Sequence, residues 1–251
     1  MPDKKPQSIY SLAPLECFDP RVFISSDKDE QKVCSFVLAL ALIYNDYHDL
    51  LWASGLHLEN PPVLKLSAER GHHIGLQFHI LRLIYANFKE TMHLISAHQE
   101  VLSNSIFQQV IQSLSKEEKK YWTALVDVSL GINTEATEFN GFLGIIRNRL
   151  AFHYSAIEPL MSGFRQCFFD NKNQKIKDAF ISRGKSMQMT RFYFADAAMI
   201  GAFNGAWAGK EKEFAVHSSE YARNIRTAIY GVVTHFIQNV RKAAWQEYSG
   251  D

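Results

Sequence analysis

The chain has 251 residues, of which 47% are hydrophobic and 13% aromatic. Such a composition can bury a sizeable core, which excludes disorder for most of the chain. Lysine and arginine total 27 against 26 acidic residues, a net charge of +1. This balance creates no overall field that would attract nucleic acid or a membrane surface, so contact with a polyanion needs a local basic cluster.

The three cysteines, Cys17, Cys34 and Cys167, lie far apart and form no CxxC motif. An odd number without paired spacing supports neither a disulfide framework nor a zinc site built on cysteine. We therefore expect a protein of a reducing compartment, the cytoplasm.

Neither an export signal nor a membrane span is expected. The first six residues are polar and lead into no long apolar run. The most apolar stretch, Val33–Tyr44, has about twelve residues, whereas a membrane-spanning helix needs roughly twenty. Asn45, Asp46 and Asp49 follow closely, and these side chains would be costly in lipid. This stretch is therefore predicted as a buried core helix without membrane contact.

Apolar residues at three- and four-residue spacing dominate most of the sequence, and no alternation indicates strands. Four of the seven prolines lie in the first twenty residues, so we expect an extended N-terminal arm over 1–30. Residues 31–251 are predicted as one all-α domain, an up-and-down helical bundle with a surface loop over 170–190. The predicted helices cover about 31–54, ending near Gly55, a long stretch from Ile74 towards Leu102, and 105–114, 116–130, 137–156, 157–169, 190–208 and 212–247.

A row of small residues in the helix predicted over 190–208 suggests close packing. Gly201, Gly205 and Gly209 are spaced four residues apart, with alanines between them. Small residues at this spacing let two helix backbones approach each other, here within a soluble core.

One segment, Ile145–Tyr154, combines two arginines and a histidine within a predicted helix. On a regular helix His153 falls on the apolar stripe, and Arg149 sits one turn earlier at its edge. Arg147 lies about 120° round the helix from His153 and roughly 9 Å along it. Cations beside an imidazole suit proton transfer at a phosphate, although a histidine on an apolar stripe is more often a structural core residue. The stripe consists of Phe139, Phe142, Leu143, Ile146 and Leu150.

The same residues resemble a family signature. Arg147-Asn148, then four residues, then His153, resembles the Rx4–6H motif of the HEPN superfamily. These are all-α domains, many of them metal-independent ribonucleases in toxin–antitoxin, phage-defence and RNA-processing systems. The resemblance covers about seven residues closely and the rest of the chain only as helical.

The resemblance implies a role for each matching residue. His153 is expected to act as general acid and base when a ribose 2′-hydroxyl attacks the adjacent phosphate. Arg147 is expected to hold that phosphate, and Asn148 to orient the arrangement by hydrogen bonding. Arg149 and Tyr154 are further candidate substrate-binding residues. HEPN domains commonly pair with their motifs facing one cleft, so we expect a homodimer that uses neither a metal nor a cofactor.

The sequence therefore favours a HEPN-like endoribonuclease for single-stranded RNA, in a toxin or phage-defence system, with an antitoxin protein as a candidate partner. In some members of the family, the antitoxin nucleotidylates a tyrosine two residues beyond the histidine. Here Tyr154 follows His153 directly and Ser155 occupies that position, so this regulation is not expected.

Two other interpretations remain open at this stage. In one, the chain keeps the HEPN scaffold but only binds a nucleotide or a partner protein in the same cleft. In the other, it is a metal-binding helical bundle, because Glu90 and His93 form a Glu-x-x-His pair, and His72 and His79 lie two turns apart on one face. A di-iron bundle needs two such pairs, and the sequence has only one, so we expect no metal site.

Overall fold

The computed structural model describes residues 16–59, 61–64, 67–151, 157–169 and 176–247. Within these ranges the regular structure is almost entirely helical, so the predicted all-α fold class is confirmed. The two named strands are two residues long: β1 (Glu16–Cys17) pairs antiparallel with β2 (Gln246–Glu247) and so joins the two ends of the described chain. In this part of the protein, none of the helices combines the length and apolarity that crossing a membrane requires.

Two long helices and a set of shorter ones form the body of the protein. The long ones are α1 (Lys28–Glu59) and α2 (Ala68–Ala97). The others are α3 (Gln99–Leu102), α4 (Ser105–Ser113), α5 (Lys116–Ser129), α6 (Thr137–Ile145), α7 (Ile157–Phe168), α8 (Tyr193–Trp207), α9 (Glu211–Asn224) and α10 (Tyr230–His235). Three segments are π-helical, η2 (Ile146–Ala151), η4 (Ile225–Ile229) and η5 (Phe236–Val240), and two are short 3₁₀ turns, η1 (Pro20–Phe23) and η3 (Met187–Met189).

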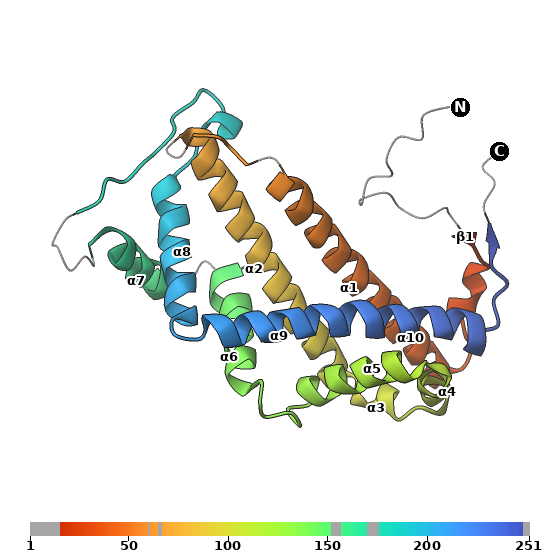
Figure 1. Ribbon diagram of the computed structural model, residues 1–251. Helices are drawn as coiled ribbons and strands as arrows, with labels where there is room; N and C mark the ends of the chain where they lie inside the picture. The colour runs from red at the N-terminus through yellow and green to blue at the C-terminus, as the bar shows by residue number, and fades with distance from the viewer. Residues whose placement is uncertain (1–15, 60, 65–66, 152–156, 170–175, 248–251) are drawn as a thin grey trace, which may run out of the picture.

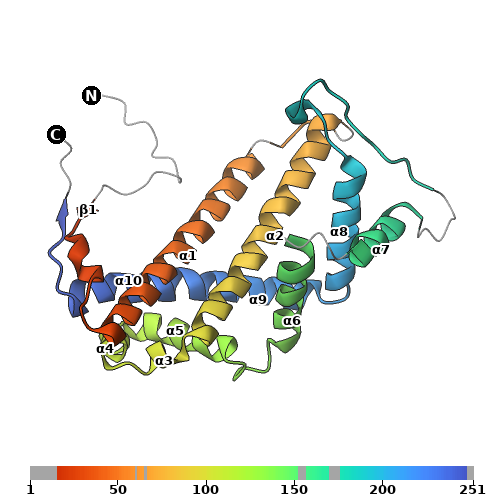
Figure 2. The same cartoon turned by 180° about the vertical axis from the view of Figure 1, so that it is seen from behind.

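α1 and α2 lie side by side and antiparallel, with their connection at one end of the protein (Figure 1). α9, η4, α10 and η5 form one continuous rod that lies across both long helices (Figures 1 and 2). α5 packs along this rod, and α7 and α8 form a closely packed pair at the far end of it. α6 and η2 lie against α2, between α8 and α5, which places the candidate motif beside the long helix.

Several predicted helix ends are wrong. The helix predicted from Ile74 towards Leu102 runs over Ala68–Ala97 as α2, and the short α3 follows it. α1 runs through Gly55 to Glu59, because one glycine inside a helix costs only about 1 kcal/mol. The helix instead stops next to the Pro61-Pro62 pair. The last helix, predicted over 212–247, ends at Val240. Lys242 has a φ of 53°, in the left-handed region that a helix cannot continue through, and the chain then turns into β2.

The segment before α1 is attached to the helical body. The Phe18 ring lies 5.3 Å from that of Trp245, and the Phe23 ring lies 5.5 Å from that of Phe236, measured between centroids. Asp27 caps α1, because its Oδ1 accepts hydrogen bonds from the backbone amides of Asp29 and Glu30 at 3.0 and 2.8 Å. Residues 16–30 of the predicted arm therefore pack on the core, and residues 1–15 lie outside the described residues.

Aromatic rings hold α6 and α8 against α2. The ring of Tyr85 on α2 contacts Phe139 and Phe142 of α6 and Phe203 and Trp207 of α8, with centroids 5.4 to 6.2 Å apart. Its hydroxyl shares a hydrogen bond of 3.0 Å with a serine of α9, and burial raises the pKa of the phenol. Because aromatic pairs prefer specific edge and offset geometries, this cluster fixes the orientation of α6 as well as its position.

α7 and α8 touch through their backbones. A Cβ placed on Gly163 would lie 2.1 Å from the carbonyl oxygen of Ala198 and 2.3 Å from the amide nitrogen of Ala202. A Cβ on Gly201 would lie 2.4 Å from the carbonyl oxygen of Gly163. The close helix packing predicted from the glycine spacing is thus confirmed at Gly201, and its partner is a glycine of α7.

We expect Gly163→Ala to lower the free energy of unfolding by about 1–3 kcal/mol or more, because the new methyl group meets backbone atoms that no side-chain rotation can move. Gly141→Ala in α6 is the matched control, since no atom lies within 4 Å of its added Cβ, and it should raise the free energy of unfolding by about 0.5–1 kcal/mol. Urea unfolding followed by circular dichroism measures both. Equal stability of the two variants would contradict the backbone contact.

Candidate functional site

The candidate motif starts in α6 and continues into the π-helical segment η2. The predicted apolar stripe is buried in both elements, since its five residues are at most 2% exposed. The prediction of a regular helix over 137–156 is wrong for residues 146–151, where the π-helix has a wider turn. The angle of about 120° and the rise of roughly 9 Å between Arg147 and His153 were calculated for a regular helix and therefore do not apply here. π-helical turns are frequent at functional sites, but η4 and η5 are π-helical as well, so the turn does not distinguish the motif from the rest of the protein.

Arg147 is held from α2 by Glu90. Nε of Arg147 donates to Oε1 of Glu90 at 2.6 Å, and Nη1 donates to Oδ1 of Asn148 at 2.9 Å. The side chains of Arg147 and Glu90 are 38% and 42% exposed. Within the described ranges, Nη2 of Arg147 has no hydrogen-bond partner. The guanidinium is thus oriented by two acceptors while part of it remains open to an anion from solvent.

Arg82, two turns before Glu90 on α2, fixes the other end of η2. Its side chain is buried, and Nη1 donates to the carbonyl oxygen of Leu150 at 2.6 Å. Nη2 donates to Nδ1 of His79 at 3.0 Å. A guanidinium has no acceptor, so Nδ1 of His79 must accept, which places the proton of the neutral imidazole on Nε2. A charged group taken out of water needs such partners, and here one of them is the backbone of the motif.

Charged groups of both signs surround Arg147. Burial lowers the pKa of Lys89, the neighbour of Glu90, and the nearby Arg147 guanidinium lowers it further. Arg149 is exposed on η2. Glu90 offsets the charge of Arg147, and two further carboxylates, Asp46 and Asp49, line the pocket that Glu90 shares. Binding of an anion here therefore depends on the oriented guanidinium of Arg147 and not on an excess of positive charge.

The structure describes three of the five predicted site residues. It brings Arg147 and Asn148 into direct contact and leaves the Arg149 side chain in solvent. The predicted general acid and base, His153, and the predicted substrate contact, Tyr154, lie outside the described residues.

Three residues of α2 take part in the site without having been predicted to. Glu90 was noted only as half of a Glu-x-x-His pair, and Lys89 and Arg82 attracted no interpretation. Nothing in their own spacing indicates a role, because each acquires one only when α2 packs against η2.

Imidazoles gather at the opposite end of α2. The rings of His57 and His73 stack with centroids 3.9 Å apart, and Nε2 of His57 donates to the carbonyl oxygen of His73 at 2.8 Å. Arg191 donates to Nδ1 of His72 at 3.1 Å. No group of three or more histidine, cysteine or carboxylate side chains in the described parts of the chain could hold a metal ion. The interpretation as a metal-binding bundle therefore gains no support from these residues.

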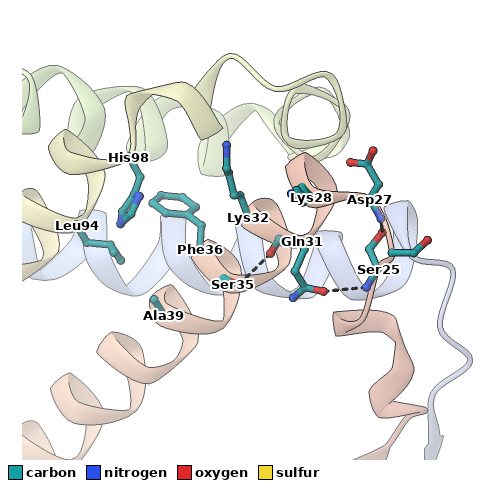
Figure 3. A pocket seen from close by; sticks show the side chains of 11 residues that line it. Ser25, Asp27, Lys28, Gln31, Lys32, Ser35, Phe36, Ala39, Leu94 and His98 are labelled. Carbon is teal, nitrogen blue, oxygen red and sulfur yellow. Dashed lines mark hydrogen bonds between the residues drawn. The ribbon is translucent and has the colours of Figure 1, made fainter.

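A cavity of about 360 Å³ lies where the start of α1 faces the end of α2, and Figure 3 shows its lining. Lys32 and His98 stand at this cavity with the ring of Phe36 between them (Figure 3). The amide of Gln31 is engaged in the turn before α1, where it accepts from the backbone of Ser25 at 2.9 Å and donates to that of Phe23 at 3.2 Å. These contacts secure the start of α1, so we place the candidate site at Arg147 instead.

No family model, curated protein or solved structure matches the chain. The HEPN resemblance accordingly rests on Arg147, Asn148 and His153, and the function has to be argued from the protein's own residues.

We expect the free energy of unfolding to fall as the pH drops below 6.5. The pKa of His79 lies below its ordinary value of 6.5, first because the ring is buried and then because Arg82 and Arg191 outweigh Asp196. The pKa of His73 is lowered too, first by burial and then by His57 and the cations around it. The unfolded chain then binds more protons than the folded one, so stability is complete above pH 6.5 and is lost towards the folded-state pKa values.

Urea unfolding at about pH 7.5 and pH 5.5 tests this expectation, since the two values bracket the titration of an unperturbed histidine. His79→Gln should reduce the pH dependence, because an amide oxygen can still accept from Arg82 but does not titrate. His93→Gln, at an exposed position of the same helix, should leave it unchanged. If the wild type, His79→Gln and His93→Gln all lost the same stability between the two pH values, the assignment of the pH dependence to His79 would be wrong.

Proposed function

We propose that this protein is a HEPN-like, metal-independent endoribonuclease of the cytoplasm that cleaves single-stranded RNA as a toxin or phage-defence component. The observation that supports this best is the Arg147 guanidinium, which Glu90 and Asn148 orient while it stays half-exposed. A preset donor group of this kind can stabilise the charge that develops on a phosphate during attack.

In the proposed reaction, the His153 imidazole removes the proton of a ribose 2′-hydroxyl, whose oxygen attacks the adjacent phosphorus. Arg147 binds the non-bridging phosphate oxygens, and Asn148 keeps the guanidinium in place. The bond to the 5′-oxygen of the next nucleotide breaks, and that oxygen takes up a proton from an imidazolium. The products are a 2′,3′-cyclic phosphate and a 5′-hydroxyl. Arg149 contributes a second phosphate contact, and Tyr154 lies next to the histidine in the sequence, where it can contact the substrate.

A homodimer is part of this proposal. Two copies related by a two-fold axis would bring two motifs to one cleft, so that the arginine of one copy can act with the histidine of the other. An antitoxin protein that covers this cleft would suppress the activity.

The second candidate function is a non-catalytic helical protein that uses the same surface to bind a nucleotide or a partner protein. The Glu90 carboxylate favours it, because at 2.6 Å from Arg147 it offsets part of the charge that a phosphate would otherwise receive. In such a protein the guanidinium would recognise its ligand without promoting any reaction.

We expect the purified protein to cleave single-stranded RNA in EDTA and to leave cyclic phosphate ends. His153→Ala and Arg147→Ala should each lower the rate by about 100-fold or more, as expected for the loss of a general base or of a charge-stabilising donor. Arg165→Ala, an exposed arginine of α7, is the matched control and should retain the wild-type rate. Gel analysis of a labelled RNA and identification of its ends measure these outcomes.

An equimolar mixture of the two inactive variants tests the shared cleft, because one composite site in each mixed dimer keeps both residues. Partial recovery of cleavage supports that arrangement, and no recovery contradicts it. The absence of cleavage by the wild-type protein would reject the nuclease. If Arg147→Ala then weakened RNA or nucleotide binding, the binding protein would be the correct interpretation.

A further inference from the structure

A pocket of about 430 Å³ opens between α1 and α2, directly beside the candidate site. Ile43 and Leu83 contribute apolar walls, and Asp46, Asn87 and Glu90 contribute oxygen acceptors. The volume lies in the lower half of the range of small-molecule sites, about 300–1,000 Å³. Glu90 belongs to both places, since it lines this pocket and accepts from Arg147 at 2.6 Å. A group bound in the pocket would therefore be a close neighbour of a phosphate on Arg147.

One buried acceptor in the pocket lacks a partner. Asn87 is only 8% exposed, and its Oδ1 has no hydrogen bond among the described residues. Its Nδ2 donates to the backbone oxygen of Ile43 at a long 3.4 Å. A buried amide oxygen without a donor costs free energy, and a ligand with an N–H group could recover it if the Asn87 amide turned its oxygen, shielded in this conformation, towards the pocket.

The carboxylates of the pocket differ in their partners. Glu90 is bound to Arg147, and Asp49 lies 3.0 Å from Nδ1 of His48. Asp46 makes no hydrogen bond or ion pair within the described parts of the chain, so both of its oxygens can accept from a ligand. These carboxylates do not form a group that could hold a metal ion. The pocket therefore offers acceptors to an organic ligand that carries several N–H donors.

We infer that this pocket binds a guanine base of the RNA, an inference that rests on the proposed nuclease function. Guanine carries two adjacent donors, N1–H and the N2 amino group, which match the two oxygens of one carboxylate such as Asp46. Adenine and cytosine place an acceptor nitrogen beside their amino group, and uracil has one N–H between two carbonyls. Each of those edges would set an acceptor against the carboxylate of Asp46, which is exposed in the free protein and which a bound base would cover. Ile43 and Leu83 would cover the faces of the base.

The arrangement also explains how a pocket lined by carboxylates can bind part of an RNA, which is itself a polyanion. The base carries no charge, and the phosphate stays on the other side of Glu90, with Arg147 and Lys89. The carboxylate of Glu90 thus lies between the pocket, whose oxygens accept hydrogen bonds from the base, and the Arg147 guanidinium, which binds the phosphate. Protein readers of single-stranded RNA recognise splayed bases by hydrogen bonds to this same edge.

The test compares cleavage of otherwise identical oligonucleotides with G, A, C or U at one position. We expect linkages next to G to be cut about tenfold or more faster than the others, the discrimination of one good bidentate pair. Asp46→Asn replaces one acceptor by a donor and should lower the ratio of cleavage at G to cleavage at A by about the same factor. Asp29→Asn on the same helix, an exposed residue outside the pocket, should leave this ratio unchanged.

A binding measurement separates this inference from the proposed function. Guanosine, which carries no phosphate, should bind the wild-type protein about tenfold more tightly than adenosine does, and Asp46→Asn should remove this difference. Preferential guanosine binding without any RNA cleavage supports the pocket and rejects the nuclease. Cleavage with the same rate at all four bases, or equal binding of both nucleosides, overturns the pocket assignment.

Discussion

Arg82 and Glu90, two turns apart on α2, hold the 146–151 segment at both of its ends. Arg82 binds the carbonyl oxygen of Leu150 from a buried position, and Glu90 binds the guanidinium of Arg147 near the surface. Eight residues of helix separate the two holding groups by about 12 Å. A rigid helix thus sets where the motif backbone lies and where its arginine points, and the aromatic cluster around Tyr85 keeps α6 at the right distance.

The two contacts differ in what they contribute. The pair between Arg147 and Glu90 is about two-fifths exposed, and ion pairs of that kind contribute only about 0–1 kcal/mol to stability. The pair orients the Arg147 guanidinium. Glu90 accepts only from Nε, so within the described ranges Nη2 stays free to donate to a ligand. The buried contact of Arg82 is the structural one, since it joins a charged group at 9% exposure to a backbone carbonyl of the motif.

The sequence predicted the class of the fold well and the partners of the site poorly. The spacing of apolar residues predicted most of the helices, and the spacing of the glycines predicted the close contact of α8 with another helix at Gly201. Local spacing carries no information on which helices meet, so Glu90 and Arg82 could not be linked to Arg147 in advance. The π-helical turn also escaped prediction, because the apolar pattern of 146–151 fits a regular helix equally well. The helix end at Val240 depends on the unusual backbone of Lys242, a conformation that lysine rarely adopts.

The small net charge of the protein limits how RNA could be held. Each phosphate neutralised on a single strand contributes a slope of about −0.7 to the salt dependence of binding, and few cations lie at this site. Arg147 and Lys89 are the cations described there, Glu90 offsets one of them, and Asp46 and Asp49 line the adjoining pocket. Electrostatic attraction alone would therefore give weak and transient binding. A nuclease with so few phosphate contacts needs a second source of affinity that depends on shape and hydrogen bonding, and the pocket on the other side of Glu90 is close enough to supply it within the same nucleotide.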